Sequence, residues 1–462
     1  MFADAEAGAG GSVGRMRSLT PLQRLGAFAM LEPISTVQQR ELPLFSAPRG
    51  AADVLPNEQP YWRQTIDTAE SICRLFGYGR IDTPIFEPAD LFERGAGEGS
   101  DVVRKEMYVF EDRSGERLAL KPEGTASICR AYLQHGMGNL PQPVRLYYLS
   151  PTFRYERPQA GRRRQHTQFG CEAIGDADAA VDADVIELLW RLYADLGLSD
   201  LVLLLNSIGD RTCRPRYLEA LRAHYQPHLR AVCRDCRDRY ARNPLRLLDC
   251  KQESCQPVIA TAPSIIDYLC DDCRRNFDDL RSYLDALDIP YELTPHLVRG
   301  LDYYTRTVFE VQPRGGGAQS TLGAGGRYDA LIEELGGKPT PATGFATGIE
   351  RIVLNMKQQK TSVPTATTTQ VYVAHQGVEA RVEAFRLASL LRREGVSTVV
   401  ATGERSLKSQ MRQANALGAA WVAILGEREL AAGTVQLRNM ADAGQRELLQ
   451  REAIQFLTGT TR

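Results

Sequence analysis

Residues 299–310 read Arg-Gly-Leu-Asp-Tyr-Tyr-Thr-Arg-Thr-Val-Phe-Glu, and this stretch decides how the whole chain is interpreted. Arg299 precedes a glycine turn, Tyr303 and Tyr304 follow it, and the later residues alternate as in a half-buried strand. A guanidinium group binds anions through paired hydrogen bonds, and a phenol hydroxyl can bind a polar nitrogen atom. The stretch therefore predicts a site for an anion and a small polar ring at the start of a strand.

The composition is that of an ordinary water-soluble protein. The chain has 462 residues, 43% hydrophobic and 24% charged, which is enough for a sizeable core and about two to four domains. Its formal net charge of -1 means that any contact with nucleic acid must come from local basic patches. The longest aliphatic run near the middle, residues 201–205, is far shorter than the roughly 20 apolar residues that span a bilayer, so we expect no membrane protein.

The first part of the chain divides into an extension and a folded domain. Residues 1–47 contain small residues, prolines and acids without a signal-peptide segment, so we expect them to be mostly disordered. Within residues 48–360, apolar residues at helical spacing across 62–76 precede a predicted strand over 80–86. Two antiparallel strands joined by a basic loop follow between 144 and 172. These elements predict an α+β domain on an antiparallel sheet, and not a doubly wound nucleotide-binding fold.

Two changes of composition divide the remainder. Residues 212–283 are rich in cysteine, arginine and aspartate, and we interpret them as an inserted domain because 201–205 and 291–310 on either side of them have the pattern of one sheet. Residues 361–369 are a threonine-rich linker. Strand and helix patterns alternate after it, so residues 370–462 are predicted to form a small α/β domain.

A basic loop lies between the two antiparallel strands. Residues 154–164 contain five arginines, beginning with Arg154, and guanidinium groups in such a loop suit phosphate binding. The simpler interpretation is a solvated, exposed loop. Gln168 and Glu172 lie four residues apart on the returning strand, so their side chains share one face and could meet at one ligand.

Two further segments place polar groups beside glycines. In residues 121–125, Glu123 and Thr125 flank a glycine ahead of a predicted helix, which suits either a helix cap or a pair of acceptors for an ammonium group. Residues 344–351 begin with a glycine and end in Arg351, which could reach a phosphate. As a glycine pattern alone the second segment is a weak signal.

In this order and spacing the segments resemble the class II aminoacyl-tRNA synthetases, and specifically the histidyl-tRNA synthetase family. The resemblance is carried by a dimer-forming segment at 81–88, by 153–172, by 299–304 with 325–329, and by 344–351. It extends over about residues 48–458. It implies a class II catalytic core with an inserted small domain and a C-terminal anticodon-binding domain.

The resemblance also implies a role for individual residues. Arg154 and Arg299 would contact the α-phosphate of ATP, and Arg351 the terminal phosphates. The residues implied to bind histidine fall into two groups: Glu123, Thr125 and Gln168 would hold its amino group, and Glu172 and Tyr304, with Tyr303 close by, would read its imidazole. Gln159 in the basic loop is the candidate for touching the end of the tRNA acceptor stem.

The implied activity is that of a cytoplasmic, homodimeric histidine-tRNA ligase. It would use ATP with Mg²⁺ to form histidyl-adenylate and pyrophosphate, and would then transfer histidine to the 3′ end of tRNA(His). The reaction needs alignment and neutralisation of charge more than proton transfer, which suits a site of arginines. The inserted domain would clamp the acceptor arm.

Two other functions compete with this one. The first is an inactive paralogue of the synthetase that acts as the regulatory subunit of ATP phosphoribosyltransferase; that protein lacks the anticodon domain and has lost catalytic residues, whereas this chain has both. The second is a zinc-dependent nucleic-acid-binding protein that uses the insertion. It gives no reason for Arg154, Arg299 and Arg351 to occur together.

The insertion has the cysteine spacing of a zinc ribbon. Cys233 and Cys236 form one pair, Cys270 and Cys273 a second, and Cys250 and Cys255 lie between them. We hypothesise a structural Zn²⁺ ion held by the four paired cysteines. The alternative is reduced thiols that only pack, and disulfides are not expected in a cytoplasmic enzyme.

Overall fold

The computed structural model describes residues 45–97, 100, 102–156, 163–315, 321–364 and 369–459. We expected residues 1–47 to be disordered; of these, only 45–47 are among the described residues. Among the described residues no helix is both long and apolar enough to cross a membrane.

The largest element is a sheet of eight strands. Neighbouring strands are antiparallel except for the outermost pairs at either end, which are parallel. In sheet order the strands are β1 (Gly79–Arg80), β5 (Val144–Phe153), β6 (Gln165–Ile174), β11 (Ala342–Gly348), β10 (Gly323–Arg327), β9 (Thr305–Pro313), β7 (Leu201–Ser207) and β8 (Tyr291–Leu293).

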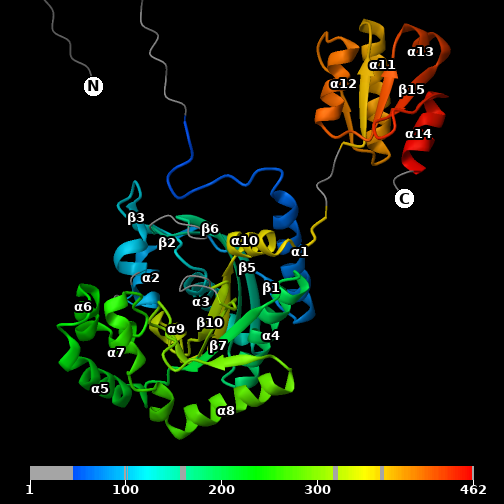
Figure 1. The fold of residues 1–462 in the computed structure, drawn as a ribbon. Coiled ribbons are helices and arrows are strands. Elements are labelled where there is room, and N and C mark those ends of the chain that lie inside the picture. The colour runs from blue at the N-terminus through cyan, green and yellow to red at the C-terminus, as the bar shows by residue number, and fades with distance from the viewer. Residues whose placement is uncertain are drawn as a thin grey trace, which may run out of the picture. The chain divides into compact units, whose positions relative to one another are not determined.

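Helices cover both faces of this sheet, as Figure 1 shows. On one face Phe169, Phe309 and Phe345 share a core with helices α1, α4, α8 and α10. On the other face Tyr148 and Val308 share a second core with α3, α5 and α9. The bounds of these helices are α1 (Gln59–Leu75), α3 (Thr125–Gln134), α4 (Ala179–Asp195), α5 (Arg214–Tyr225), α8 (Asp271–Ala286), α9 (Leu331–Glu334) and α10 (Ile349–Gln359).

The strand predicted over residues 80–86 is wrong in its extent. The chain forms β1 in the large sheet and then β2 (Phe86–Pro88) in a separate sheet, with residues 81–85 in neither. Pro84 lies in this gap, and a proline cannot donate the hydrogen bond that a continuous strand needs there. The second sheet has the order β2-β4-β3, with β4 (Arg117–Leu120), β3 (Tyr108–Glu111) and helix α2 (Ala89–Ala96) close by.

The insertion consists mostly of helices. It leaves the large sheet after β7 and returns to it at β8, and in Figure 1 its helices are green, with α5, α6 and α7 grouped together. Short 3₁₀ turns connect them. The elements not yet given are η3 (Gln226–His228), α6 (Arg234–Arg242), η4 (Pro244–Leu247), η5 (Glu253–Cys255), α7 (Gln256–Ala260) and η6 (Ile265–Tyr268).

The last segment forms a five-stranded sheet with its own helices. The strand order is β13-β12-β14-β15-β16; the first three strands are parallel and the last two join them in antiparallel pairs. The alternation of strand and helix matches the α/β pattern of the sequence. The bounds are β12 (Val371–His375), α11 (Val378–Arg393), β13 (Thr398–Val400), α12 (Leu407–Ala416), β14 (Trp421–Leu425), α13 (Glu427–Ala432), β15 (Thr434–Asn439), β16 (Gln445–Leu449) and α14 (Gln450–Gly459).

The predicted fold class is confirmed: an antiparallel α+β core, an insertion, and a C-terminal domain with its own sheet. The core is fixed by a buried ion pair in which Arg327 on β10 donates from Nε to Asp182 on α4 at 3.1 Å, both side chains being fully buried. Thr307 on β9 donates to the same carboxylate at 3.2 Å, so this group ties one helix to two strands.

Candidate active site

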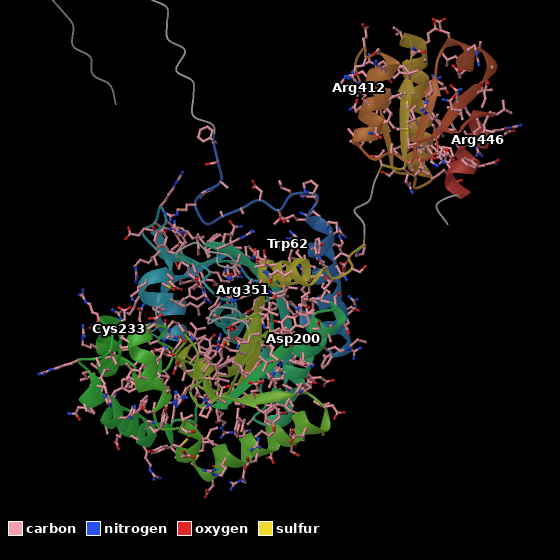
Figure 2. The ribbon with its side chains drawn as sticks, in the orientation of Figure 1. Trp62, Asp200, Cys233, Arg351, Arg412 and Arg446 are labelled. Atoms are coloured by element: carbon pink, nitrogen blue, oxygen red, sulfur yellow. The ribbon has the colours of Figure 1, made fainter. Side chains whose placement is uncertain are left out.

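The three arginines predicted to bind phosphate line one cavity of about 280 Å³. Arg154 follows β5, Arg299 precedes β9, and Arg351 lies in the first turn of α10, where Figure 2 labels it. Residues far apart in the sequence thus line one cavity because β5, β6, β11, β10 and β9 are five consecutive strands of the sheet. Four arginines and one lysine line this cavity together with four carboxylates. Guanidinium groups bind phosphate through paired hydrogen bonds, so the arginines suit a polyphosphate.

Each of these arginines is held by a neighbour. Arg154 donates from Nε to the carbonyl oxygen of Pro122 at 2.8 Å. Arg299 forms an ion pair with Glu310. Arg351 donates to the carbonyl oxygen of Thr321, whose hydroxyl donates to Glu310 Oε2 at 2.8 Å, so Glu310 and Thr321 link the last two arginines.

Glu310 is a site residue that the sequence reasoning missed. It is the last residue of the opening stretch and lies between buried neighbours on β9, where an unpaired carboxylate would be costly. The signal for Glu310 was an acidic residue within a strand whose other residues are mostly buried. Asp249 and Lys251 of the insertion also line the cavity and were not predicted to do so.

His166 lies in the same cavity and carries no charge at neutral pH. Burial and the nearby Arg154 and Arg351 lower its pKa to about 3. Its Nε2 atom and the Thr152 hydroxyl are 2.9 Å apart. Because this imidazole is neutral, the positive charges in the cavity are those of the arginines and Lys251.

A second group of predicted residues surrounds Glu172 on β6. Glu172 is buried; its Oε1 accepts a hydrogen bond from the Thr125 hydroxyl at 2.7 Å and its Oε2 from the Tyr328 hydroxyl at 2.5 Å. Burial raises the pKa of Glu172 to about 8, although both hydrogen bonds act to lower it. The side chain is therefore a neutral carboxyl near pH 7.

Glu123 caps helix α3. Its carboxylate accepts hydrogen bonds from the backbone N–H groups of Thr125 at 2.8 Å and Ala126 at 2.9 Å. The Tyr303 hydroxyl lies 3.4 Å from the same carboxylate. The cap considered for this segment is therefore present, but Glu123 provides it, and the Thr125 hydroxyl points to Glu172 instead.

Aromatic rings form the walls of this region. The ring centroids of Tyr303 and Tyr304 are 4.7 Å apart, and those of Tyr303 and Tyr328 are 5.7 Å apart. The Tyr148 hydroxyl lies 3.4 Å from Gln168 Oε1. Tyr148 and Tyr328 were not predicted as site residues, because a tyrosine inside a strand or after one is most often part of the core.

Two glycines make room for these side chains. A Cβ atom at Gly344 would lie 1.8 Å from Glu172 Oε2, and one at Gly170 would lie 2.4 Å from the Tyr148 ring. Such contacts are shorter than any side chain tolerates, so both positions need glycine. The weak glycine pattern at 344–351 thus has a physical role beside the carboxylate.

The basic loop is described only in part. Gln159, the candidate for the acceptor stem, lies outside the described residues, as do 157–162 as a whole. Of the residues that the structure describes, Arg163 lines the phosphate cavity and the Arg164 guanidinium stacks on the Tyr155 ring, 3.8 Å from its centroid.

The paired cysteines do not form one group, so the ligand set predicted for zinc is wrong. Cys233 and Cys236 lie with Cys250 and Cys255, whereas Cys270 and Cys273 lie with Asp210 and Cys213. In each group the possible ligand atoms are all within 4.8 Å of one another. The two Cys-x-x-Cys pairs begin different helices, α6 and α8, and α8 packs on α4, so spacing alone could not show which cysteines meet.

Two family models match the chain. One describes histidyl-tRNA synthetase and matches residues 50–352. The other describes an anticodon-binding domain and matches residues 370–460.

Relatives of known function match over most of the chain. A histidine-tRNA ligase of Dehalococcoides mccartyi is 56% identical over 402 residues, which cover 87% of this chain and 96% of the relative. One of Caldanaerobacter subterraneus is 47% identical, covering 88% and 97%. Among solved structures, the apo histidyl-tRNA synthetase of S. aureus is 35% identical with a TM-score of 0.75, covering 90% of this chain and all of that one.

Proposed function

The chain belongs to the histidyl-tRNA synthetase family, and from this premise we propose how its residues activate histidine with ATP and pass it to tRNA(His). Arg154 and Arg299 bind the α-phosphate of ATP, and Arg351 the terminal phosphates. The proposal is supported by the shared cavity of the three arginines and by their anchoring through Pro122, Glu310 and Thr321. Anchored cations neutralise developing charge without reorganising during the reaction.

Mg²⁺ would accompany ATP at this site. Hard cations prefer carboxylate oxygens and phosphate, and the cavity offers Glu310 and Asp249 beside Arg299. These two residues would hold the ion, which supplies further neutralisation of the phosphate charge. The protein's own task is to align the histidine carboxylate with the α-phosphorus.

Histidine occupies the region around Glu172. Glu172 and Tyr304, with Tyr303 beside them, read the imidazole, and Glu123, Thr125 and Gln168 hold the amino group. Hydrogen bonds from Thr125 and Tyr328 fix the Glu172 carboxyl in one orientation. A competitor without imidazole nitrogens leaves these buried groups unpaired, which discriminates by about 10⁴-fold or more.

The two chemical steps follow from this placement. An oxygen of the histidine carboxylate bonds to the α-phosphorus, the bond from that phosphorus to the bridging oxygen breaks, and pyrophosphate leaves. A terminal ribose hydroxyl of the tRNA then attacks the carbonyl carbon of the adenylate and releases AMP. Gln159 remains the candidate for contact with the acceptor stem.

The wider organisation is part of the same proposal. Residues 48–360 form the catalytic domain, 212–283 the insertion that clamps the acceptor arm, 361–369 the linker and 370–462 the domain that recognises the anticodon. The enzyme acts in the cytoplasm as a homodimer. A structural Zn²⁺ ion in the insertion is retained in the proposal, with a changed set of ligands.

The regulatory subunit of ATP phosphoribosyltransferase is not favoured as an alternative. Two relatives that match 87% and 88% of the chain are histidine-tRNA ligases, and a match to an anticodon-binding domain covers residues 370–460. The three arginines share one cavity, which an inactive paralogue has no need to keep.

Histidine-dependent exchange of pyrophosphate into ATP tests the proposal. The parent protein should catalyse exchange with histidine alone among the amino acids. Arg299→Ala should lower the rate by about 10²-fold to 10³-fold, because a fixed donor to developing charge is lost. Arg314→Ala, which removes an exposed arginine beyond the same strand, is the matched control and should keep the parent rate.

Two results would contradict this assignment. Folded parent protein that exchanges with no amino acid would favour the regulatory paralogue. An Arg299→Ala variant as active as the Arg314→Ala control would remove Arg299 from the site.

A further inference from the structure

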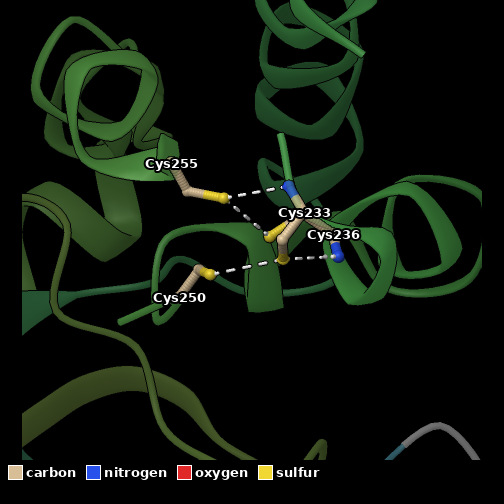
Figure 3. A group of neighbouring side chains, drawn as sticks. All are labelled: Cys233, Cys236, Cys250 and Cys255. Atoms are coloured by element: carbon tan, nitrogen blue, oxygen red, sulfur yellow. Dashed lines mark hydrogen bonds between the residues drawn. The ribbon is translucent and has the colours of Figure 1, made fainter. Parts of the chain in front are cut away.

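Four cysteine side chains of the insertion converge on one point. Figure 3 shows Cys233, Cys236, Cys250 and Cys255 pointing toward one another from the start of α6, from the segment after η4 and from the end of η5. Cys236, Cys250 and Cys255 are buried, and Cys233 is partly buried. Figure 2 shows Cys233 among the helices of the insertion.

Two sulfur–sulfur distances match those of a tetrahedral metal site, and all four sulfur atoms lie within 4.8 Å of one another. Cys233 Sγ lies 3.8 Å from Cys250 Sγ, and Cys236 Sγ lies 3.8 Å from Cys255 Sγ. Zinc–sulfur bonds of about 2.3 Å in a tetrahedron place the sulfur atoms about 3.8 Å apart. A disulfide would bring two of them to about 2.05 Å, so the arrangement suits four separate thiolates.

Backbone donors point at two of these sulfur atoms. The Cys233 N–H donates to Cys255 Sγ at 3.3 Å, and the Cys236 N–H donates to Cys233 Sγ at 3.4 Å. Hydrogen bonds to sulfur stabilise the negative thiolate, which is the form that binds metal. Such outer contacts also orient metal ligands.

The cluster encloses a segment that reaches the phosphate cavity. Cys250 lies between Asp249 and Lys251, and both of these residues line the cavity that contains Arg299. Arg246, only 7% exposed, donates to the carbonyl oxygen of Arg299 at 3.1 Å. Asn243 donates to Asp302 Oδ1 at 2.6 Å.

We propose that Cys233, Cys236, Cys250 and Cys255 bind one structural Zn²⁺ ion, which fixes this segment as a wall of the ATP site. The ion links the start of α6 to the end of η5, so that residues 243–251 between them form a closed loop. This loop then holds Arg246, Asp249 and Lys251 against the residues around Arg299. The metal site stands on its own geometry; the link to ATP rests on the proposed function of the cavity.

The second cluster does not support the same inference. Asp210 Oδ1 already accepts hydrogen bonds from the N–H groups of Thr212 at 2.9 Å and Cys213 at 3.2 Å. Its other oxygen lies 3.9 Å from Arg306. The carboxylate of that group is thus engaged without a metal ion.

Metal content is the first test. Full-length protein is expressed with zinc in the medium, purified without chelator and analysed by mass spectrometry for metals, beside Cys250→Ser, Cys255→Ser and Cys73→Ser. Cys73 is a buried thiol next to Cys171, outside the insertion, and serves as the control. We expect Cys250→Ser and Cys255→Ser each to carry about one equivalent less zinc than the parent and the control.

The parent protein provides a second measurement that needs no variant to fold. Replacement of zinc by Co²⁺ should give the intense visible absorption and the sulfur-to-metal charge-transfer bands of a tetrahedral tetrathiolate site. Parent protein without zinc and without these bands overturns the metal site. Loss of zinc in Cys270→Ser, with zinc kept in Cys255→Ser, overturns the ligand set.

The link to ATP is tested by pyrophosphate exchange. In Cys250→Ser we expect the KM for ATP to rise about tenfold, because the segment that supports the cavity is no longer held in place. The KM for histidine should change less than about twofold. Loss of zinc with an unchanged KM for ATP overturns the link but not the metal site. Zinc-loaded parent that shows no exchange at all contradicts the proposed function and leaves the metal result standing.

Discussion

At the scale of single residues, Glu172 shows how burial sets the state of the site. Its carboxyl has no cation among the hydrogen-bond partners described here; Thr125 and Tyr328 both donate neutral hydroxyls. These bonds do not offset the cost of burying a charge, so the pKa is raised to about 8. Glu172 is thus a neutral acid near pH 7.

This shift predicts how stability depends on pH. Because folding raises the pKa of Glu172 from 4.5 to about 8, its contribution is fully present below the lower value and is lost as pH rises through the higher one. The free energy of unfolding of the parent, relative to Glu172→Gln, should therefore fall by about 1.4 kcal/mol per pH unit between about pH 5 and 8. Urea titrations of ligand-free protein across this range measure the difference.

Glu111→Gln, which removes an exposed carboxylate from β3, is the control for that comparison. A difference between the parent and Glu172→Gln that stays constant from about pH 5 to 8 would show that Glu172 is ionised in the folded protein.

Residues whose side chains would bind a ligand directly could be predicted from the sequence. The residues that hold those side chains in position could not. Arg154, Arg299 and Arg351 stand in segments whose glycines and neighbours indicate phosphate binding, and they line one cavity. Tyr328 and Glu310 were missed, because a tyrosine near a strand or an acid within one gains its role only from the partner that the fold brings to it. The cysteines were predicted as ligands but wrongly grouped, since their contacts depend on how α6 and α8 pack.

At the scale of elements, the sheet β2-β4-β3 has one apolar face that stays accessible. Phe86 pairs with Leu120, and Leu120 with Tyr108; Leu118 pairs with Phe110, so these residues share a face. Phe86 is 49% exposed and Phe110 42% exposed. The opposite face carries the buried Glu87 and Ala119. The face contains part of the segment 81–88 expected to form the dimer, so we predict that it is the surface through which two chains associate.

A charge on this face should separate the subunits. Phe86→Glu places a carboxylate in the apolar surface, and we expect sedimentation velocity to give the mass of two chains for the parent and one for the variant at micromolar concentration. Leu293→Glu, which changes a 44% exposed strand residue at the far edge of the large sheet, is the control and should stay dimeric. A parent protein of one chain, or a dimeric Phe86→Glu variant, would show that this face is not the interface.

At the scale of the whole molecule, the C-terminal domain has its own core. The two hydrophobic clusters of this region consist, among the described residues, only of side chains from residues 371–457. The clusters of the catalytic domain likewise draw their buried residues from 69–356. Alternating strand and helix patterns made this division visible in the sequence, because each domain must close its own core.

Separate cores predict that the two domains can be separated without loss of adenylate chemistry. A chain that ends at residue 364 keeps every arginine of the phosphate cavity and every residue proposed to bind histidine, so it should retain histidine-dependent pyrophosphate exchange. Transfer of histidine to tRNA(His) should fall by about 10²-fold or more, because anticodon and acceptor ends are no longer bound by one molecule. Adding residues 369–462 as a separate chain should restore little, since the effective concentration that the linker provides is gone. Exchange activity of the truncated chain shows that it is folded, and full transfer activity in that chain would contradict the role assigned to the C-terminal domain.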